Sequence, residues 1–147
     1  MYAKTLISRA AIIFFLIFIA GMAKGASDTL QFHYGRSVFA TFQNEQWWNP
    51  AESWKNKYKD YDAGDKREAY LGSRSLLVWL TDAWHLAQTI ETLAWALATM
   101  FAIRLGFNSY NSESRQRSIA GLIGFLVLTV LVFYTGFLFL YGWVLVR

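Results

Sequence analysis

Three long apolar blocks, separated by polar segments, constrain the fold of this chain more than any other feature. The blocks cover residues 5–23, 73–105 and 119–146, and most charged residues lie between Lys24 and Arg74. A helix needs about 20 mainly apolar residues to cross a bilayer. Because 55% of the 147 residues are hydrophobic and only one is proline, we expect a single all-α integral membrane domain over residues 1–147. It would contain two or three transmembrane helices and an external, aromatic-rich loop with a short interfacial helix.

Composition also excludes several classes of function. The chain has no cysteine, which excludes disulfides, thiolate metal sites and cysteine nucleophiles. Its net charge of +4 is too diffuse to indicate nucleic-acid binding, and no basic-aromatic nucleic-acid module is present. We therefore expect the lipid bilayer and other membrane protein subunits as partners, and no nucleic acid.

The first block, residues 5–23, allows two interpretations. Its continuous apolar part, Ala10 to Ala23, suits the core of a signal peptide, and Ala23 and Gly25 could precede a cleavage site. Alternatively the whole block is a retained anchor. In both cases the chain from Lys24 onward leaves the cytoplasm.

Residues 24–72 are expected to form an external segment that lies on the membrane surface. Asn49 can cap a helix, Pro50 fits its first position, and Glu52 has the spacing of a capping box, which predicts a short helix over residues 50–59. The sequence "DYDAGDKRE" predicts a turn. Indole rings favour the headgroup zone of a bilayer. The expected interfacial anchors are Trp47, Trp48, Trp54, Trp79 and Trp84.

The second and third blocks predict a long helix over residues 73–105 and another over residues 119–146, joined by a cytoplasmic connector at 108–118. Basic residues flank the first block and the connector, which places the N-terminus inside, if it is retained, and residues 24–72 and the C-terminus outside. Ala120 and Gly124 have the small-xxx-small spacing of a close helix contact, either within this chain or with another subunit.

The second block contains three ionisable residues that need an explanation. Asp82 and His85 are three residues apart on a helix and can form a direct hydrogen bond. The pair is either a metal or proton site or a satisfied pair at the wet end of the helix. Glu91 lies outside the polar stripe of this helix, which includes Gln88 and Thr92 and is expected to face another helix or a partner. We expect Glu91 to be protonated, bonded to Gln88, or paired with a basic residue of another chain, as a partner contact or a proton relay.

Other site chemistries have weaker support. His33 and His85 could hold a haem between them, but two histidines carry no spacing signature, so no cofactor is favoured. The acidic turn at Asp60, Asp62 and Asp65 departs from calcium-loop spacing. No catalytic motif assigns a nucleophile, so no catalytic residue is named.

The sequences "WNPAESWKNKYK" and "GSRSLLVWLTDAWHL" resemble those of small, uncharacterised inner-membrane proteins of Bacteroidota type. The shared pattern is WNP, SWxNKYK and TDxWH, which here spans residues 47 to 86. This resemblance implies a compartment, the bacterial inner membrane, and no known activity.

The sequence therefore favours a non-enzymatic small membrane protein that acts as an accessory or structural subunit of a larger membrane complex. Two or three spans are too few to build a pore or a catalytic cavity alone. The alternative is a membrane-embedded enzyme, or a metal- or haem-binding protein, that uses Asp82, His85 and Glu91.

Overall fold

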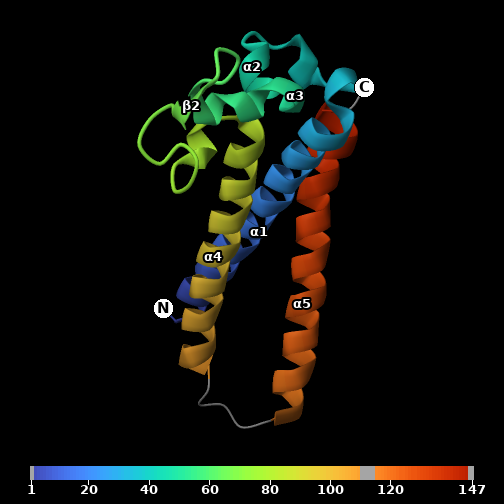
Figure 1. The fold of residues 1–147 in the computed structure, drawn as a ribbon. Coiled ribbons are helices and arrows are strands. Elements are labelled where there is room, and N and C mark those ends of the chain that lie inside the picture. The colour runs from blue at the N-terminus through green and yellow to red at the C-terminus, as the bar shows by residue number, and fades with distance from the viewer. Residues whose placement is uncertain (1, 110–114, 146–147) are drawn as a thin grey trace.

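The computed structural model shows three long helices that carry a small head at one end (Figure 1). It describes the backbone of residues 2–109 and 115–145 and the side chains of residues 8–104 and 121–145. The long helices are α1 (Tyr2–His33), α4 (Ala83–Ser109) and α5 (Arg115–Leu138), and α5 continues as the π-helix η5 (Phe139–Leu145). Three segments are long and apolar enough to cross a membrane: residues 8–36 in α1 and the turn after it, 83–104 in α4, and 121–145 in α5 and η5. The membrane class expected from the sequence agrees with this.

The first helix is longer than the apolar block predicts. We expected it to end at Ala23, whereas α1 continues to His33 and contains Lys24 and Asp28. These two side chains form an ion pair four residues apart on α1, a spacing that stabilises helices. Ala23 and Gly25, considered above for cleavage, lie inside α1 and are buried. Residues 24–33 therefore belong to a candidate span and not to the surface segment.

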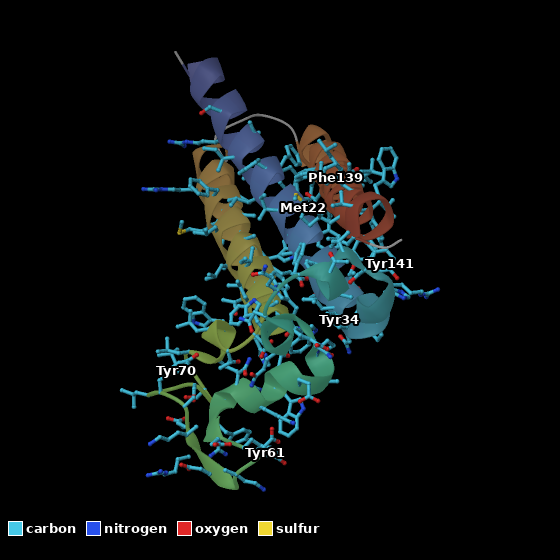
Figure 2. The ribbon with its side chains drawn as sticks, turned by 90° about the horizontal axis from the view of Figure 1, so that it is seen from above. Met22, Tyr34, Tyr61, Tyr70, Phe139 and Tyr141 are labelled. Carbon is cyan, nitrogen blue, oxygen red and sulfur yellow. The ribbon has the colours of Figure 1, made fainter. Side chains whose placement is uncertain are left out.

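Glycines allow α1 and α5 to cross at close range. A Cβ atom on Gly21 would lie 2.1 Å from the Phe133 carbonyl oxygen, and one on Gly136 would lie 2.3 Å from the Phe18 carbonyl oxygen. Gly25 approaches the Phe137 carbonyl oxygen in the same way. Only residues without a side chain permit this backbone contact. Met22 and Phe139 lie in this crossing region (Figure 2).

α1 also packs along α4, so it lies at the centre of the three helices (Figure 1). Ile13 and Ile17 of α1 form a buried cluster with Ala98 of α4. Trp95 of α4 reaches Phe133 of α5, with 5.6 Å between the ring centroids. Small residues on α4 let α1 approach, and large aromatic side chains fill the wider space toward α5.

The head begins with short helical turns after α1. These are η1 (Tyr34–Arg36), η2 (Val38–Thr41), α2 (Glu45–Trp48), α3 (Pro50–Ser53) and η3 (Trp54–Lys57). Asn49 caps α3 as predicted, because its side-chain oxygen accepts a hydrogen bond from the Ala51 N–H at 3.0 Å and Pro50 occupies the first position. The predicted helix over 50–59 is wrong in extent, since its α-helical part ends at Ser53. Glu52 forms an ion pair with Lys55, and the described hydrogen bonds to the Asn49 N–H do not include Glu52.

A β-hairpin corrects the all-α expectation. Strands β1 (Tyr58–Asp60) and β2 (Asp65–Glu68) pair antiparallel around the turn predicted from "DYDAGDKRE". Gly64 supplies the positive φ, 85°, that the turn needs. Trp54 and Tyr58 pack against Tyr61, the first residue of the hairpin turn. Tyr61 lies at the far side of the head from the long helices (Figure 2).

α4 starts ten residues after the position predicted from Ser73. Residues 70–81 form turns and the short 3-10 helix η4 (Val78–Leu80), and α4 begins only after Asp82. The predicted start at Ser73 is wrong because Leu76 and Leu77 extend the apolar block but do not belong to the helix. At the other end, α5 starts at Arg115, within the predicted connector 108–118, whose residues 110–114 lie outside the described residues.

The head is fixed to the helices by a buried cluster. Leu30 of α1, Phe39 of η2, Ala83 of α4 and Leu145 of η5 form its centre. Trp47, Trp48 and Trp84 pack around it, and Trp48 stacks on Phe39 with 5.1 Å between ring centroids. The C-terminal end of α1 and the π-helix η5 that continues α5 therefore share one hydrophobic core with the head.

Candidate functional site

Asp82 forms the N-terminal cap of α4. Its Oδ1 accepts a hydrogen bond from the backbone N–H of His85 at 2.9 Å. Its Oδ2 lies 2.7 Å from His85 Nδ1 and accepts from the Thr81 hydroxyl at 2.9 Å. Aspartate is among the best capping residues because it satisfies amide groups that have no partner within the helix. The hydrogen bond predicted between Asp82 and His85 is confirmed.

These bonds keep the Asp82 carboxylate ionised although it is buried. The residue is 1% exposed. Burial alone raises the pKa of Asp82, but the hydrogen bonds and charge of His85, together with the Thr81 hydroxyl, hold that pKa below its ordinary value. Because the carboxylate accepts the Nδ1 proton, the lone pair of a neutral His85 ring lies on Nε2.

Asn56 connects this cap to the head. Its side-chain amide donates to the Thr81 carbonyl at 2.8 Å and to the Gln46 carbonyl at 3.1 Å. The first of these bonds joins positions 25 residues apart in the chain. The "SWxNKYK" and "TDxWH" patterns, separate in sequence, therefore meet in space at Asn56 and Thr81.

A pocket of about 220 Å³ lies where the head meets the start of α4. It is lined by Gln31, Pro50, Ser53, Trp54, Asp82, Trp84 and His85. The hydroxyl of Ser53 and the Nε2 atom of His85 make no hydrogen bond to any described residue, whereas Trp54 donates its indole N–H to the Ala51 carbonyl. The buried indole nitrogen of Trp84 also has no partner among the described residues. Of these three atoms only the Trp84 nitrogen is buried, whereas the Ser53 hydroxyl and His85 Nε2 are accessible and can bind a polar ligand in the pocket.

Sequence reasoning missed Ser53, Gln31 and Trp54 as members of one site. Ser53 is buried at the end of α3, Gln31 lies in the last turns of α1, and Trp54 starts η3. Because the sequence predicts that the first helix ends at Ala23, it places Gln31 in the surface segment and not in the helix. Only the joint pattern of "SWxNK" and "TDxWH" could have suggested that these segments meet.

Glu91 faces α1 and not the polar stripe. It interacts electrostatically with Lys24 and Asp28 of α1, which themselves form an ion pair. A basic residue of the same chain therefore lies near Glu91, where we had considered one from another chain. The sequence signal is the charged pair in "GMAKGASD", which the apolar pattern alone places in the surface segment.

The polar stripe of α4 faces outward. Ala87, Ala94 and Ala98 are buried against the rest of the chain, whereas Gln88, Thr92 and Thr99 are exposed on the opposite side. Thr92 donates its hydroxyl proton to the Gln88 carbonyl at 2.9 Å. Within the described residues, the other two side chains have no hydrogen-bond partner. The three side chains are therefore exposed and do not form part of the core among the described residues.

The structure does not bring His33 to His85. His33 Nε2 bonds to the Tyr141 hydroxyl, and its Nδ1 lies 3.3 Å from an Arg36 nitrogen. His33 is also absent from the pocket lining. Among the described side chains, no group of three or more potential ligands is arranged to hold a metal ion, which includes the acidic residues of the hairpin.

The remaining sequence candidates lie as follows. Trp47, Trp48 and Trp84 are partly buried in the cluster under the head, Trp79 lies in η4, and Trp54 lies at the pocket. Gly124 is exposed, and a Cβ atom there would meet nothing within 4 Å. The side chain of Ala120 lies outside the described residues. The close contact within the chain occurs at Gly21, Gly25 and Gly136.

Comparison of the chain with protein-family models, with curated proteins and with solved structures gives no match.

Proposed function

We propose that this protein is a non-enzymatic accessory subunit that binds another membrane protein through the outward face of α4. The observation that supports the proposal is the exposed polar stripe formed by Gln88, Thr92 and Thr99, with Ala96 beside it. Its members lie in the candidate span 83–104, where the surroundings of an exposed side chain are lipid or protein.

The physical reason is the cost of polar groups in hydrocarbon. An amide or hydroxyl without a hydrogen-bond partner costs roughly 2–7 kcal/mol to transfer into an apolar medium. A neighbouring helix can supply such partners, and a small residue such as Ala96 allows it to approach closely. The bilayer offers no equivalent partner at this depth.

We propose the bacterial inner membrane as the location, with the N-terminus inside and the head outside. Basic residues near the ends of short cytoplasmic segments set orientation. Lys4 and Arg9 precede or begin the first span, Arg104 ends the second, and Arg115 and Arg117 precede the third. All five would then lie in or near the cytoplasm, and the balanced charges of the head would lie outside.

Photo-crosslinking in intact cells tests the proposed interface. A photoreactive amino acid at position 99 lies on the stripe, and the same residue at position 97 lies roughly 160° away around α4, given 100° per residue. Leu97 is exposed and therefore a matched control. We expect an adduct of defined mass from position 99, formed with a membrane protein that also co-purifies with the unmodified chain in mild detergent. Equal adducts from both positions, or a monomeric particle without partners, would contradict the proposal.

A further inference from the structure

We propose that the pocket between the head and α4 binds an ammonium group, presented by a zwitterionic lipid headgroup or by a free amine. Seven residues line this pocket: Gln31, Pro50, Ser53, Trp54, Asp82, Trp84 and His85. The charges, unpaired hydrogen-bonding atoms and aromatic faces of these residues together determine which ligand the pocket can bind. None of these features was assigned above to the contact with another subunit.

The charge of the pocket selects for a cation. Asp82 contributes a carboxylate, and the lining contains no lysine or arginine. The Asp82 side chain is 2% exposed, so water screens its charge poorly, and its field is stronger than that of a surface carboxylate. When His85 is neutral, an anionic headgroup would be repelled by this carboxylate, whereas an ammonium group would be attracted.

Hydrogen-bond acceptors are available where a cation would need them. The Asp82 oxygens are already occupied by His85 and Thr81. When His85 is neutral, its Nε2 and the Ser53 hydroxyl oxygen can each accept a hydrogen bond from a ligand, and neither makes one to a described residue. A primary ammonium carries three N–H donors, which matches these acceptors and the side-chain oxygen of Gln31.

Aromatic walls complete the site. Trp54 and Trp84 both line the pocket, and an indole face attracts a cation more strongly than other side-chain rings do. A volume of about 220 Å³ exceeds the needs of a single ordered water.

The position of the pocket also favours a membrane ligand. Gln31 lies near the head end of the candidate span 8–36, and Trp84 and His85 lie at the head end of the span 83–104. Both spans therefore end at the pocket, at the depth where lipid headgroups lie.

The test is a titration of the full chain in detergent, followed by the seven tryptophan indole N–H signals in a ¹⁵N–¹H spectrum. Single Trp→Phe variants assign the signals. The ligands are dihexanoyl-phosphatidylethanolamine, dihexanoyl-phosphatidylglycerol and ethanolamine. We expect saturable shifts of the Trp54 and Trp84 signals with phosphatidylethanolamine, at least five-fold weaker binding of phosphatidylglycerol, and no shift of the exposed Trp143. If ethanolamine binds at least as tightly as the lipid, the source is a free amine, and weaker binding of ethanolamine identifies the lipid.

Asp82→Asn is the decisive variant, because asparagine caps a helix as well as aspartate does but carries no charge. We expect it to weaken ammonium binding at least five-fold. Asp62→Asn, at the exposed hairpin turn, is the matched control and leaves binding unchanged. Trp54→Leu gives an independent measure if Asp82→Asn fails to fold, and it should weaken binding at least three-fold. Equal binding of the two lipids, no shift with any ammonium ligand, or unchanged binding in folded Asp82→Asn would overturn the proposal.

Discussion

Asp82 combines two roles at the scale of a single residue, a helix cap and a buried charge. Asp82→Ala removes the cap and leaves His85 and Thr81 without their acceptor. We expect the free energy of unfolding to fall by about 2–3 kcal/mol, since a cap contributes about 1 and hydrogen bonds to a charged group somewhat more. Asp82→Asn keeps the cap, so its loss in the free energy of unfolding should be less than half that of Asp82→Ala. Denaturant unfolding in detergent, followed by the helical circular dichroism signal, measures both.

The charge of Asp82 should also make the stability of the fold depend on pH in the acid range. The pKa of Asp82 in the folded chain is below its ordinary value of 3.8. Its contribution to stability is therefore complete above pH 3.8 and is lost as pH falls through the lower, folded value. Across this range the wild-type protein should lose more stability than Asp82→Asn. Parallel losses in the two proteins would show that the Asp82 charge does not stabilise the fold.

Asp65 gives a second pH prediction, at the hairpin. Hydrogen bonds from the Arg67 side chain and backbone N–H lower the pKa of Asp65 from 3.8 to about 2. Because the folded pKa is depressed, the ion pair favours the hairpin above pH 3.8 and stops doing so as pH falls through about 2. In Arg67→Gln the pKa of Asp65 should rise toward 3.8, which a carboxyl-carbon NMR titration measures. An unchanged Asp65 value in the variant would contradict the assignment.

Lys24 compensates two acids inside the helices. It pairs with Asp28 and acts electrostatically on Glu91. Lys24→Met should lower the free energy of unfolding by about 1–2 kcal/mol, less than for a fully buried pair because the Lys24 side chain is 40% exposed. Adding Glu91→Gln should restore part of the loss, since one uncompensated acid is removed. Unfolding of the single and double variants in detergent tests this, and simple additivity of the two substitutions would argue against coupling.

At the scale of elements, the contact between α1 and α5 depends on missing side chains. Gly136→Ala would place a methyl group 2.3 Å from the Phe18 carbonyl oxygen, so the helices must separate. We expect a loss of about 1–3 kcal/mol from this overpacking. Gly121→Ala lies in the same helix with nothing within 4 Å, and it should be neutral or stabilising by up to about 1 kcal/mol, because alanine favours helix. Thermal unfolding of monomeric protein in detergent compares the two variants, and equal effects would contradict the crossing.

The sequence predicts these elements where local chemistry decides them and fails where distant contacts do. Asn49 and Pro50 start α3 as predicted, and the Asp82–His85 bond follows from spacing alone. The end of α1 cannot be predicted in this way. Lys24 and Asp28 form an ion pair and Gly25 contacts α5, so the polar stretch after Ala23 remains helical. The start of α4 fails for the opposite reason. Leu76 and Leu77 are apolar, but the Asp82 cap determines where the helix begins.

Of the candidate site, the sequence indicates the half on α4 and misses the half in the head. Asp82 and His85 belong to one helical turn, so their pairing is local. Ser53 and Gln31 join them only because Asn56 bonds to the Thr81 carbonyl and α1 continues past Ala23. Contacts across 25 residues or more carry no periodic signal that a single sequence exposes.

For the whole molecule, α1 is the element that holds the others together. It packs along α4 and crosses α5 (Figure 1). α5 returns to the head, where Leu145 of η5 packs with Leu30, Phe39 and Ala83. The head and the end of η5 therefore lie at one end of the helices, and Arg104 lies toward the other.

This arrangement makes the proposed orientation directly testable, because the chain has no cysteine and a single introduced one can be labelled. Asp62→Cys lies at the exposed hairpin turn of the head, and Arg104→Cys lies at the opposite end of the second span. With the head outside, a membrane-impermeant maleimide should label Asp62→Cys in intact bacterial cells and Arg104→Cys only after the inner membrane is permeabilised. The reverse pattern would overturn the orientation while leaving the three spans intact. Labelling of both in intact cells would contradict the spans themselves, since residues 62 and 104 are separated by one crossing.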